Sequence, residues 1–269
     1  MKFSDKLSTA SKKNDSLLCV GLDPDMGKIS SFLRSADDPI FEFNKRIIDA
    51  TKDLVIAYKP NLAFYEALGL GGLKSLVKTM EYIPDDIPVI GDAKRGDVGH
   101  SARAYARAMF DVLGFDAVTV NPYLGTDSIA PFLDYEDKGV FVLCRTSNPS
   151  AKEFQDVGPK PLYQIVAESV VKWNVHKNCG VVVGATYPDE LRKIRELVGE
   201  DMWILIPGIG VQGGDLRAAV KSGTNSHGER AIICSSRGIL YAGAKDDFDK
   251  KAREAALALR EQINLFRRD

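Results

Sequence analysis

The sequence predicts a (β/α)₈ (TIM) barrel in a single domain spanning residues 1–269, on three observations. Short apolar, mostly β-branched runs recur eight times along the chain. Segments with the apolar spacing of amphipathic helices lie between these runs. The length of 269 residues is close to that typical of this fold. Near-continuous apolar strands that alternate with helices are typical of a parallel sheet covered by helices.

The apolar runs are the expected strands, in the order of the barrel. They lie at 17–22, 55–58, 89–91, 117–120, 140–144, 180–183, 203–206 and 231–234. The expected helices include 41–54, 102–113, 162–173 and 191–198, where apolar residues recur every three or four positions. A doubly wound open sheet is the alternative. It is disfavoured because Gly21-Leu22-Asp23-Pro24-Asp25 follows the first run in place of a G-x-G-x-x-G phosphate-binding sequence.

The composition argues against several classes of function. A formal net charge of −1 predicts no nucleic-acid partner and no attraction to a membrane. The four cysteines are far apart and include no C-x-x-C pair, so we expect reduced core residues of a cytoplasmic protein. The three histidines lack metal-ligand spacing, and no metal site is expected. The apolar run at 17–20 is too short for a signal-peptide core or a membrane span.

Charged residues gather after the third apolar run, in Asp92-Ala93-Lys94-Arg95-Gly96-Asp97. Side chains alternate between the faces of an extended segment, so Asp92 and Lys94 are expected to point the same way, about 6 to 7 Å apart along the chain. Gly96 is expected to let the backbone bend out of the strand before Asp97. A surface salt-bridge cluster is the simpler interpretation. The apolar strand in front of these charges favours a functional site instead.

Six other apolar runs also end in polar residues. Because a barrel has its active site at the carboxyl ends of its strands, these residues are candidates for the chemistry. They are Asp23 after the first run, Lys59-Pro60-Asn61 after the second, Asn121-Pro122-Tyr123 after the fourth, Arg145-Thr146-Ser147-Asn148-Pro149 after the fifth, Pro207 to Gly214 after the seventh, and Ser235-Ser236-Arg237-Gly238 after the eighth.

The last two of these loops predict a phosphate site. The glycines between Gly208 and Gly214 permit a close approach of the backbone to a ligand. Barrels often bind phosphate at the loops that follow strands seven and eight. Gln212 offers an amide donor, and the guanidinium of Arg237 has the fork that fits a phosphate with two hydrogen bonds.

The chain resembles the orotidine 5′-monophosphate decarboxylase family over nearly its whole length. The resemblance is carried by Val20-Gly21-Leu22-Asp23, Lys59-Pro60-Asn61, the D-x-K-x-x-D at 92–97, Pro207-Gly208-Ile209-Gly210 with Gln212-Gly213-Gly214, and Ser236-Arg237-Gly238. The sequence at 92–97 is similar to that of the branch found in many bacteria and archaea. The same holds for Ser101-Ala102, Tyr105-Ala106 and Thr146-Ser147-Asn148-Pro149.

This resemblance implies a cofactor-free carboxy-lyase that converts orotidine 5′-phosphate to UMP and CO₂ in de novo pyrimidine synthesis. Lys94 would lie next to C6, stabilise the developing negative charge and deliver the proton. Asp92 would lie against the substrate carboxylate, in a network in which Lys59, Asp92, Lys94 and Asp97 alternate in charge. Asp97 would reach into the partner's active site, which implies a homodimer with shared active sites.

The resemblance also implies the substrate contacts. Asp23 and Lys59 would hold the ribose hydroxyls, and Ser101 would face the ribose in the partner's site. The other implied contacts are those of Ser147 with the pyrimidine, of Pro207 with the substrate, and of Gln212 and Arg237 with the phosphate. The roles of Asn61 and His100 stay open.

Two other functions account for parts of the sequence. A metal-dependent sugar-phosphate enzyme of the same superfamily, such as a keto-gulonate-phosphate decarboxylase or a hexulose-phosphate synthase, shares the pattern at 92–97. Such an enzyme has an acidic metal ligand where this sequence has Lys59, and a lysine repels a divalent cation. A regulatory nucleotide-binding barrel without catalysis would lack one of Lys59, Asp92, Lys94 and Asp97, and all four are present.

Overall fold

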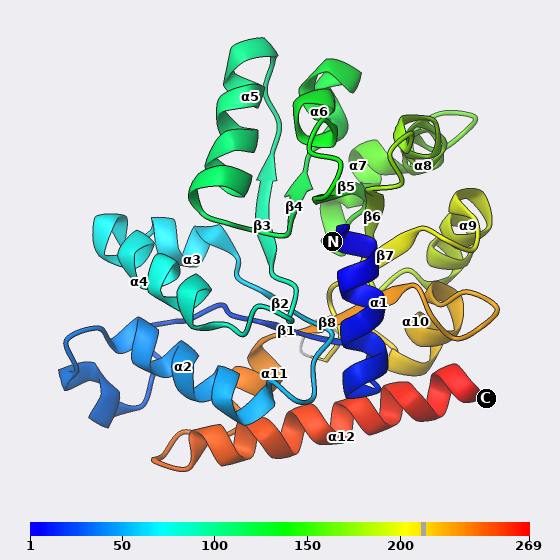
Figure 1. The fold of residues 1–269 in the computed structure, drawn as a ribbon. Helices are drawn as coiled ribbons and strands as arrows, with labels where there is room; N and C mark the ends of the chain where they lie inside the picture. Colours follow the sequence, from blue (N-terminus) through cyan, green and yellow to red (C-terminus); the bar gives the residue numbers. More distant parts are fainter. Residues whose placement is uncertain (211–213) are drawn as a thin grey trace.

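The computed structural model describes residues 1–210 and 214–269 (Figure 1). Within these residues, eight strands form one parallel sheet in the order β2-β1-β8-β7-β6-β5-β4-β3. The strands are β1 (Leu18–Gly21), β2 (Ala57–Lys59), β3 (Ile90–Arg95), β4 (Ala117–Val120), β5 (Gly139–Arg145), β6 (Cys179–Val183), β7 (Trp203–Ile206) and β8 (Ala231–Ser235). Each predicted run contributes one of them.

The two ends of this sheet, β2 and β3, meet and close the barrel. Parallel bridges join Tyr58 to Val89 and Asn61 to Asp92. The N–H of Tyr58 donates to the carbonyl of Pro88, and the N–H of Asp92 donates to that of Pro60, both over 3.0 Å. The predicted (β/α)₈ barrel is therefore confirmed, and the open doubly wound alternative is wrong.

Helices surround the barrel. They are α1 (Phe3–Asn14), α2 (Pro39–Thr51), α3 (Leu62–Glu66), α4 (Gly69–Tyr82), α5 (Gly99–Arg107), α6 (Thr126–Leu133), α7 (Lys152–Gln155), α8 (Leu162–Trp173), α9 (Pro188–Val198), α10 (Leu216–Gly223), α11 (Arg237–Leu240) and α12 (Phe248–Arg268). In Figure 1, α12 runs along one side of the barrel beside α2, α11 and α10.

The helix boundaries follow local capping chemistry. The prediction over 162–173 agrees with α8 at both ends. The helix predicted over 41–54 begins earlier, because Pro39 suits a first turn and the Asp38 carboxylate accepts the N–H of Phe41. The segment predicted over 102–113 is α5 followed by one π-helical turn at Ala108–Val112.

Helix α1 closes the amino-terminal end of the barrel. The Phe3 ring packs edge-on against Phe141 of β5, with the ring centroids 5.8 Å apart. The Trp203 indole N–H, at the start of β7, donates to Ser4 Oγ over 3.0 Å. With this end covered, the opposite end of the barrel is the one open to a ligand.

The four cysteines are free and buried, in agreement with the expected core positions. Among the described residues, no helix combines the length and the apolar character that crossing a membrane requires.

Candidate active site

A cavity of about 410 Å³ opens at the carboxyl ends of the strands, a size within the usual range for small-molecule sites. Its walls come from every strand end. The lining residues are Gly21, Asp23, Lys59, Asn61, Asp92, Lys94, Thr119, Leu143, Thr146, Ser147, Asn148, Val182, Leu205, Pro207, Gly208, Ile209, Cys234, Ser235, Ser236, Arg237 and Gly238. Seven predicted site residues are among them: Asp23, Lys59, Asp92, Lys94, Ser147, Pro207 and Arg237.

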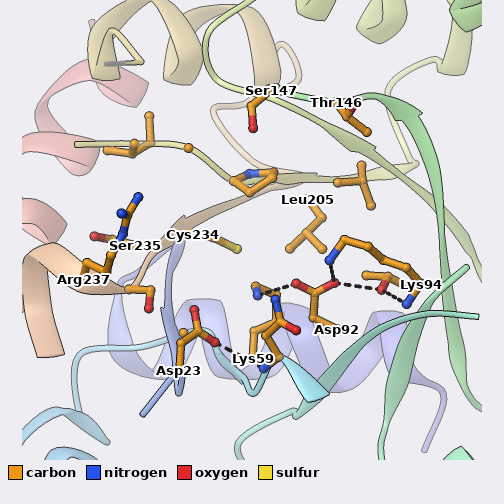
Figure 2. A pocket seen from close by; sticks show the side chains of 18 of the residues that line it. Asp23, Lys59, Asp92, Lys94, Thr146, Ser147, Leu205, Cys234, Ser235 and Arg237 are labelled. Atoms are coloured by element: carbon orange, nitrogen blue, oxygen red, sulfur yellow. Dashed lines mark hydrogen bonds and ion pairs between the residues drawn. The ribbon is translucent and has the colours of Figure 1, made fainter. Parts of the chain in front are cut away.

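Asp92 stands between two ammonium groups (Figure 2). Lys59 Nζ lies 2.9 Å from Asp92 Oδ2, and Lys94 Nζ lies 2.6 Å from Asp92 Oδ1. The side chains of Lys59 and Asp92 are only 8% and 12% exposed, whereas that of Lys94 is 47% exposed and faces the cavity. Two cations thus share one carboxylate, with the accessible cation on the side where a ligand would lie.

This arrangement keeps Asp92 and Lys59 charged. Burial raises the pKa of Asp92, but the charges and hydrogen bonds of Lys59 and Lys94 outweigh burial and hold the pKa well below its usual value. Burial lowers the pKa of the Lys59 ammonium, and the negative charges of Asp92 and Asp23 overcome this and raise it. A buried lysine that stays protonated is therefore fixed as a cation beneath the cavity.

The backbone turns at Lys94, which differs from the expected extended geometry. Lys94 has a φ of +48°, in the left-handed region that residues with a Cβ rarely adopt. Its side chain and that of Asp92 still meet, as predicted. Gly96 has a different role from the one expected, because an added Cβ there would lie 2.7 Å from the carbonyl oxygen of Asn121. Gly96 therefore permits a close approach between two loops.

Thr119, in β4, was not among the predicted site residues. Its Oγ1 accepts the backbone N–H of Lys94 and donates to Asp92 Oδ1, both over 2.9 Å. A β-branched residue inside an apolar run resembles any other strand residue. The only signal was that Thr119 is the one hydroxyl in that run.

Asp23 and Asn61 form the wall next to Lys59. The N–H of Asn61 donates to Asp23 Oδ1 over 3.2 Å, and the Asn61 side chain accepts the N–H of Ala63 at the start of α3. Asn61 thus caps a helix and at the same time lines the cavity. Asn61 therefore has a structural role: its side chain caps α3, and its backbone N–H orients the Asp23 carboxylate.

The loop after β5 is held by a buried arginine. Arg145 is 1% exposed, stacks 3.7 Å from the centroid of the Tyr187 ring, and donates to Gln155 Oε1 over 3.2 Å. Gln155 in turn accepts the N–H of Thr146 over 2.9 Å. Arg145 therefore anchors this loop and does not line the cavity, while Ser147 points into the cavity from it (Figure 2).

The predicted phosphate end lies across the cavity from Lys94 (Figure 2). Arg237 begins α11 directly after β8 and lines this end together with Pro207 and Gly208. Gly208 has a φ of +100°, which suits glycine alone among the amino acids. Gln212 lies outside the described residues.

Two predicted residues lie away from the cavity within one chain. The Asp97 carboxylate accepts the N–H of Val98 over 2.8 Å, and Ser101 is exposed on α5. Neither is among the lining residues. The predicted charge network is thus present for Lys59, Asp92 and Lys94, and its extension to Asp97 stays a prediction.

The described part of the chain holds no group of three or more His, Cys, Asp or Glu side chains arranged to bind a metal ion. The lining instead combines fixed cations, carboxylates and an apolar floor that includes Leu143, Val182 and Leu205. This is a site for an anionic organic ligand, with one arginine at one end and a Lys–Asp–Lys group at the other.

These features define a (β/α)₈-barrel enzyme with its charged catalytic candidates on β2 and β3 and its candidate anion site after β7 and β8. The family model described as "Orotidine 5′-phosphate decarboxylase / HUMPS family" matches residues 16–252. The chain belongs to this family.

Relatives of known name agree along the whole chain. A protein of Dehalococcoides mccartyi named orotidine 5′-phosphate decarboxylase is 52% identical over 274 aligned positions, which cover 100% of this chain and 99% of the relative. One of the same name from Cellvibrio japonicus is 50% identical, with 99% of this chain and 100% of the relative covered. The solved Leishmania donovani OMP decarboxylase has a TM-score of 0.88 at 40% identity, and each chain is covered completely.

Proposed function

We propose that this chain decarboxylates orotidine 5′-phosphate to UMP and CO₂ in pyrimidine biosynthesis, with Lys94 as the proton donor. Membership of the family and about 50% identity to full-length decarboxylases support the activity. The observation that carries the mechanism is the pair of ammonium groups on Asp92, with Lys94 facing the cavity.

The chemistry requires a cation beside a carbanion. When the bond between C6 and the carboxylate breaks, CO₂ leaves and the electron pair stays on C6, where no conventional electron sink exists. An ammonium at this place stabilises the negative charge as it develops, and then supplies the proton that completes UMP. Lys94 suits both tasks, because its side chain is charged, faces the cavity and is accessible enough to regain a proton from water.

Asp92 and Lys59 hold that ammonium in place. Asp92 is largely shielded from water and is joined to Lys59 through its other oxygen, so it has little freedom to leave Lys94. In the proposed complex, Asp92 lies against the substrate carboxylate before CO₂ leaves. Lys59 also argues against a metal-dependent sugar-phosphate enzyme. Its ammonium lies 2.9 Å from Asp92, at the position where such an enzyme has an acidic metal ligand.

The remaining contacts hold the substrate from its far end. Arg237, with Gln212, binds the phosphate, and Asp23 and Lys59 hold the ribose hydroxyls. Ser147 contacts the pyrimidine, and Pro207 also contacts the substrate. Because the phosphate is remote from C6, its binding energy is available to orient the base and to drive loop closure.

We also propose a cytoplasmic homodimer in which Asp97 and Ser101 act in the partner's site. Exposed apolar side chains occur next to Asp97 and in the loop that Gly96 contacts at Asn121: Val98 is 51% exposed, Tyr123 82% and Leu124 48%. Arg95 joins this region to α3 and α5 through Glu66 and the Tyr105 ring. An exposed apolar group of this kind is typical of a protein interface. The buried, free cysteines agree with a reducing compartment.

Loss of the orotate absorbance on conversion to UMP tests the activity directly. Lys94→Ala should lower turnover by several orders of magnitude, a loss of more than about 4 kcal/mol of transition-state stabilisation. UMP should still bind. Lys221→Ala, on the exposed side of α10, is the matched control and should keep wild-type turnover. Near wild-type decarboxylation by Lys94→Ala would exclude the proposed mechanism.

Subunit mixing tests the shared site. In a two-fold dimer, a Lys94→Ala chain paired with an Asp97→Ala chain has one site with both lesions and one intact site. Random reassortment of equal amounts makes half of the dimers mixed, so recovered activity should approach about a quarter of wild type. Each variant alone should be nearly inactive. Verified mixed dimers with no activity above that of the parents would show that Asp97 does not act across an interface.

A further inference from the structure

Strand β3 loses its regular pairing with β4 at the catalytic motif. Gly91 pairs with Val118, but the next paired residue, Arg95, lies opposite Val120. Four steps along β3 thus correspond to two steps along β4, which leaves residues 92–94 without regular main-chain partners on β4. Lys94 lies in this bulge with a φ of +48°.

Thr119 is the residue of β4 opposite the bulge. Its hydroxyl replaces the missing strand hydrogen bond by accepting the backbone N–H of Lys94 over 2.9 Å. The same hydroxyl donates to Asp92 Oδ1 over 2.9 Å, and that oxygen receives the Lys94 ammonium over 2.6 Å. A closed ring of hydrogen bonds therefore runs from the backbone of Lys94 through Thr119 and Asp92 to the Lys94 side chain.

We propose that Thr119 is a positioning residue for Lys94, which fixes both the left-handed backbone and the carboxylate that aims the ammonium. This inference rests on the proposed role of Lys94 as the proton donor. Thr119 is 1% exposed, and it lines the floor of the cavity. It acts on the reaction through Lys94 and Asp92.

Loss of the Thr119 hydroxyl should reduce turnover while leaving substrate binding nearly unchanged. Without the hydroxyl, the N–H of Lys94 loses its partner and Asp92 loses one of the donors that orient it. The ammonium is then free to leave the position beside C6, and small misplacements of a catalytic group strongly reduce rate. The proposed phosphate and ribose contacts come from β2 and from segments that follow β1, β7 and β8, and among the described residues none of them bonds to Thr119.

Four variants test the role. Thr119→Val keeps the shape and removes the hydroxyl, and kcat should fall by about 10- to 100-fold. Thr119→Ser keeps the hydroxyl and should retain most of the wild-type kcat. Thr119→Ala differs from the Ser variant only by the missing hydroxyl, and its kcat should be as low as that of Thr119→Val. Thr51→Val is the control, because it removes a buried hydroxyl that bonds to Tyr58 outside the cavity. It should leave kcat unchanged.

The affinity for UMP should change by less than about threefold in all four variants, since the contacts to phosphate and ribose remain. If Thr119→Val fails to fold, the Ser and Ala variants make the same comparison. Wild-type kcat in the Val or Ala variant, an equally slow Ser variant, or a loss of UMP affinity equal to the loss of kcat would overturn the proposal. Failure of the proposed function shows separately, as turnover retained by Lys94→Ala.

Discussion

Replacing Lys59 with methionine removes the buried cation of the Lys59–Asp92 pair while keeping a long, unbranched side chain. The two charged groups lie 2.9 Å apart, with side chains only 8% and 12% exposed. Removing one partner of a buried ion pair leaves the other charge uncompensated and typically destabilises a protein by about 3 to 5 kcal/mol. Asp92 keeps its bonds to Lys94 and Thr119, so we expect the lower end, about 3 kcal/mol.

Lys52→Met is the matched control. Lys52 pairs with Asp49 over 3.0 Å, but the side chains are 48% and 44% exposed. Exposed pairs contribute about 0 to 1 kcal/mol, because water screens the charges and the side chains lose entropy on pairing. The two variants therefore make the same chemical change in two different dielectric environments.

Urea unfolding at neutral pH, followed by the fluorescence of Trp173 and Trp203, measures the difference through the midpoint and the slope of the transition. Adding Asp92→Asn to the Lys59→Met protein removes the uncompensated charge and should recover part of the lost stability. If Lys59→Met unfolds at the same urea concentration as Lys52→Met, burial does not strengthen this pair and the reasoning is wrong.

Three further outcomes follow from the geometry. Because the pKa of Asp92 lies below its usual value, its charge stabilises the fold above pH about 4, and this contribution is lost as the pH falls through the lowered pKa. The urea stabilities of wild type and Asp92→Asn should therefore differ by a constant amount above pH about 5 and converge in acid. A difference that widens in acid would contradict this. Arg237→Ala should cost about 1.5 to 3 kcal/mol in kcat/KM for the nucleotide, and an equal loss for the nucleoside would show that Arg237 does not bind phosphate. Gly96→Ala should destabilise the protein in thermal unfolding, because the new Cβ would lie 2.7 Å from a backbone oxygen. Gly71→Ala, with open space around it in α4, should stabilise the protein by about 0.5 to 1 kcal/mol. A Gly96→Ala protein more stable than Gly71→Ala would refute the contact.

Periodicity was sufficient to predict the barrel, because buried parallel strands leave a strong local signal. The runs at 117–120 and 203–206 agree with β4 and β7 at both ends. Neither α1 nor α12 was among the predicted helices. Helix α1 has just three apolar residues, Phe3, Leu7 and Ala10, all of them buried, and its place is set by contacts with strands far along the chain. Such long-range packing leaves little pattern in the local sequence.

The site was predictable to the extent that it depends on strand ends. Asp92 and Lys94 meet as expected, but through a left-handed residue and a register shift that alternation alone does not predict. Thr119 was missed for the same reason, since its partners are determined by how β3 pairs with β4. Arg145, at the end of a strand, is buried and anchors a loop, because it stacks on the Tyr187 ring and donates a hydrogen bond to Gln155. Both partners come from other segments of the chain.

The left-handed backbone at Lys94 lowers the stability of the fold, whereas the proposed catalysis requires the lysine side chain at this position. A residue with a Cβ in this conformation costs about 1 to 2 kcal/mol, and glycine escapes most of that cost. A library randomised at position 94 and selected for folding alone should drift to glycine or asparagine, whereas selection for growth without added uracil should return lysine. Among barrels descended from a common ancestor, a glycine at this place would then mark a lineage that has been released from decarboxylation while it kept the fold.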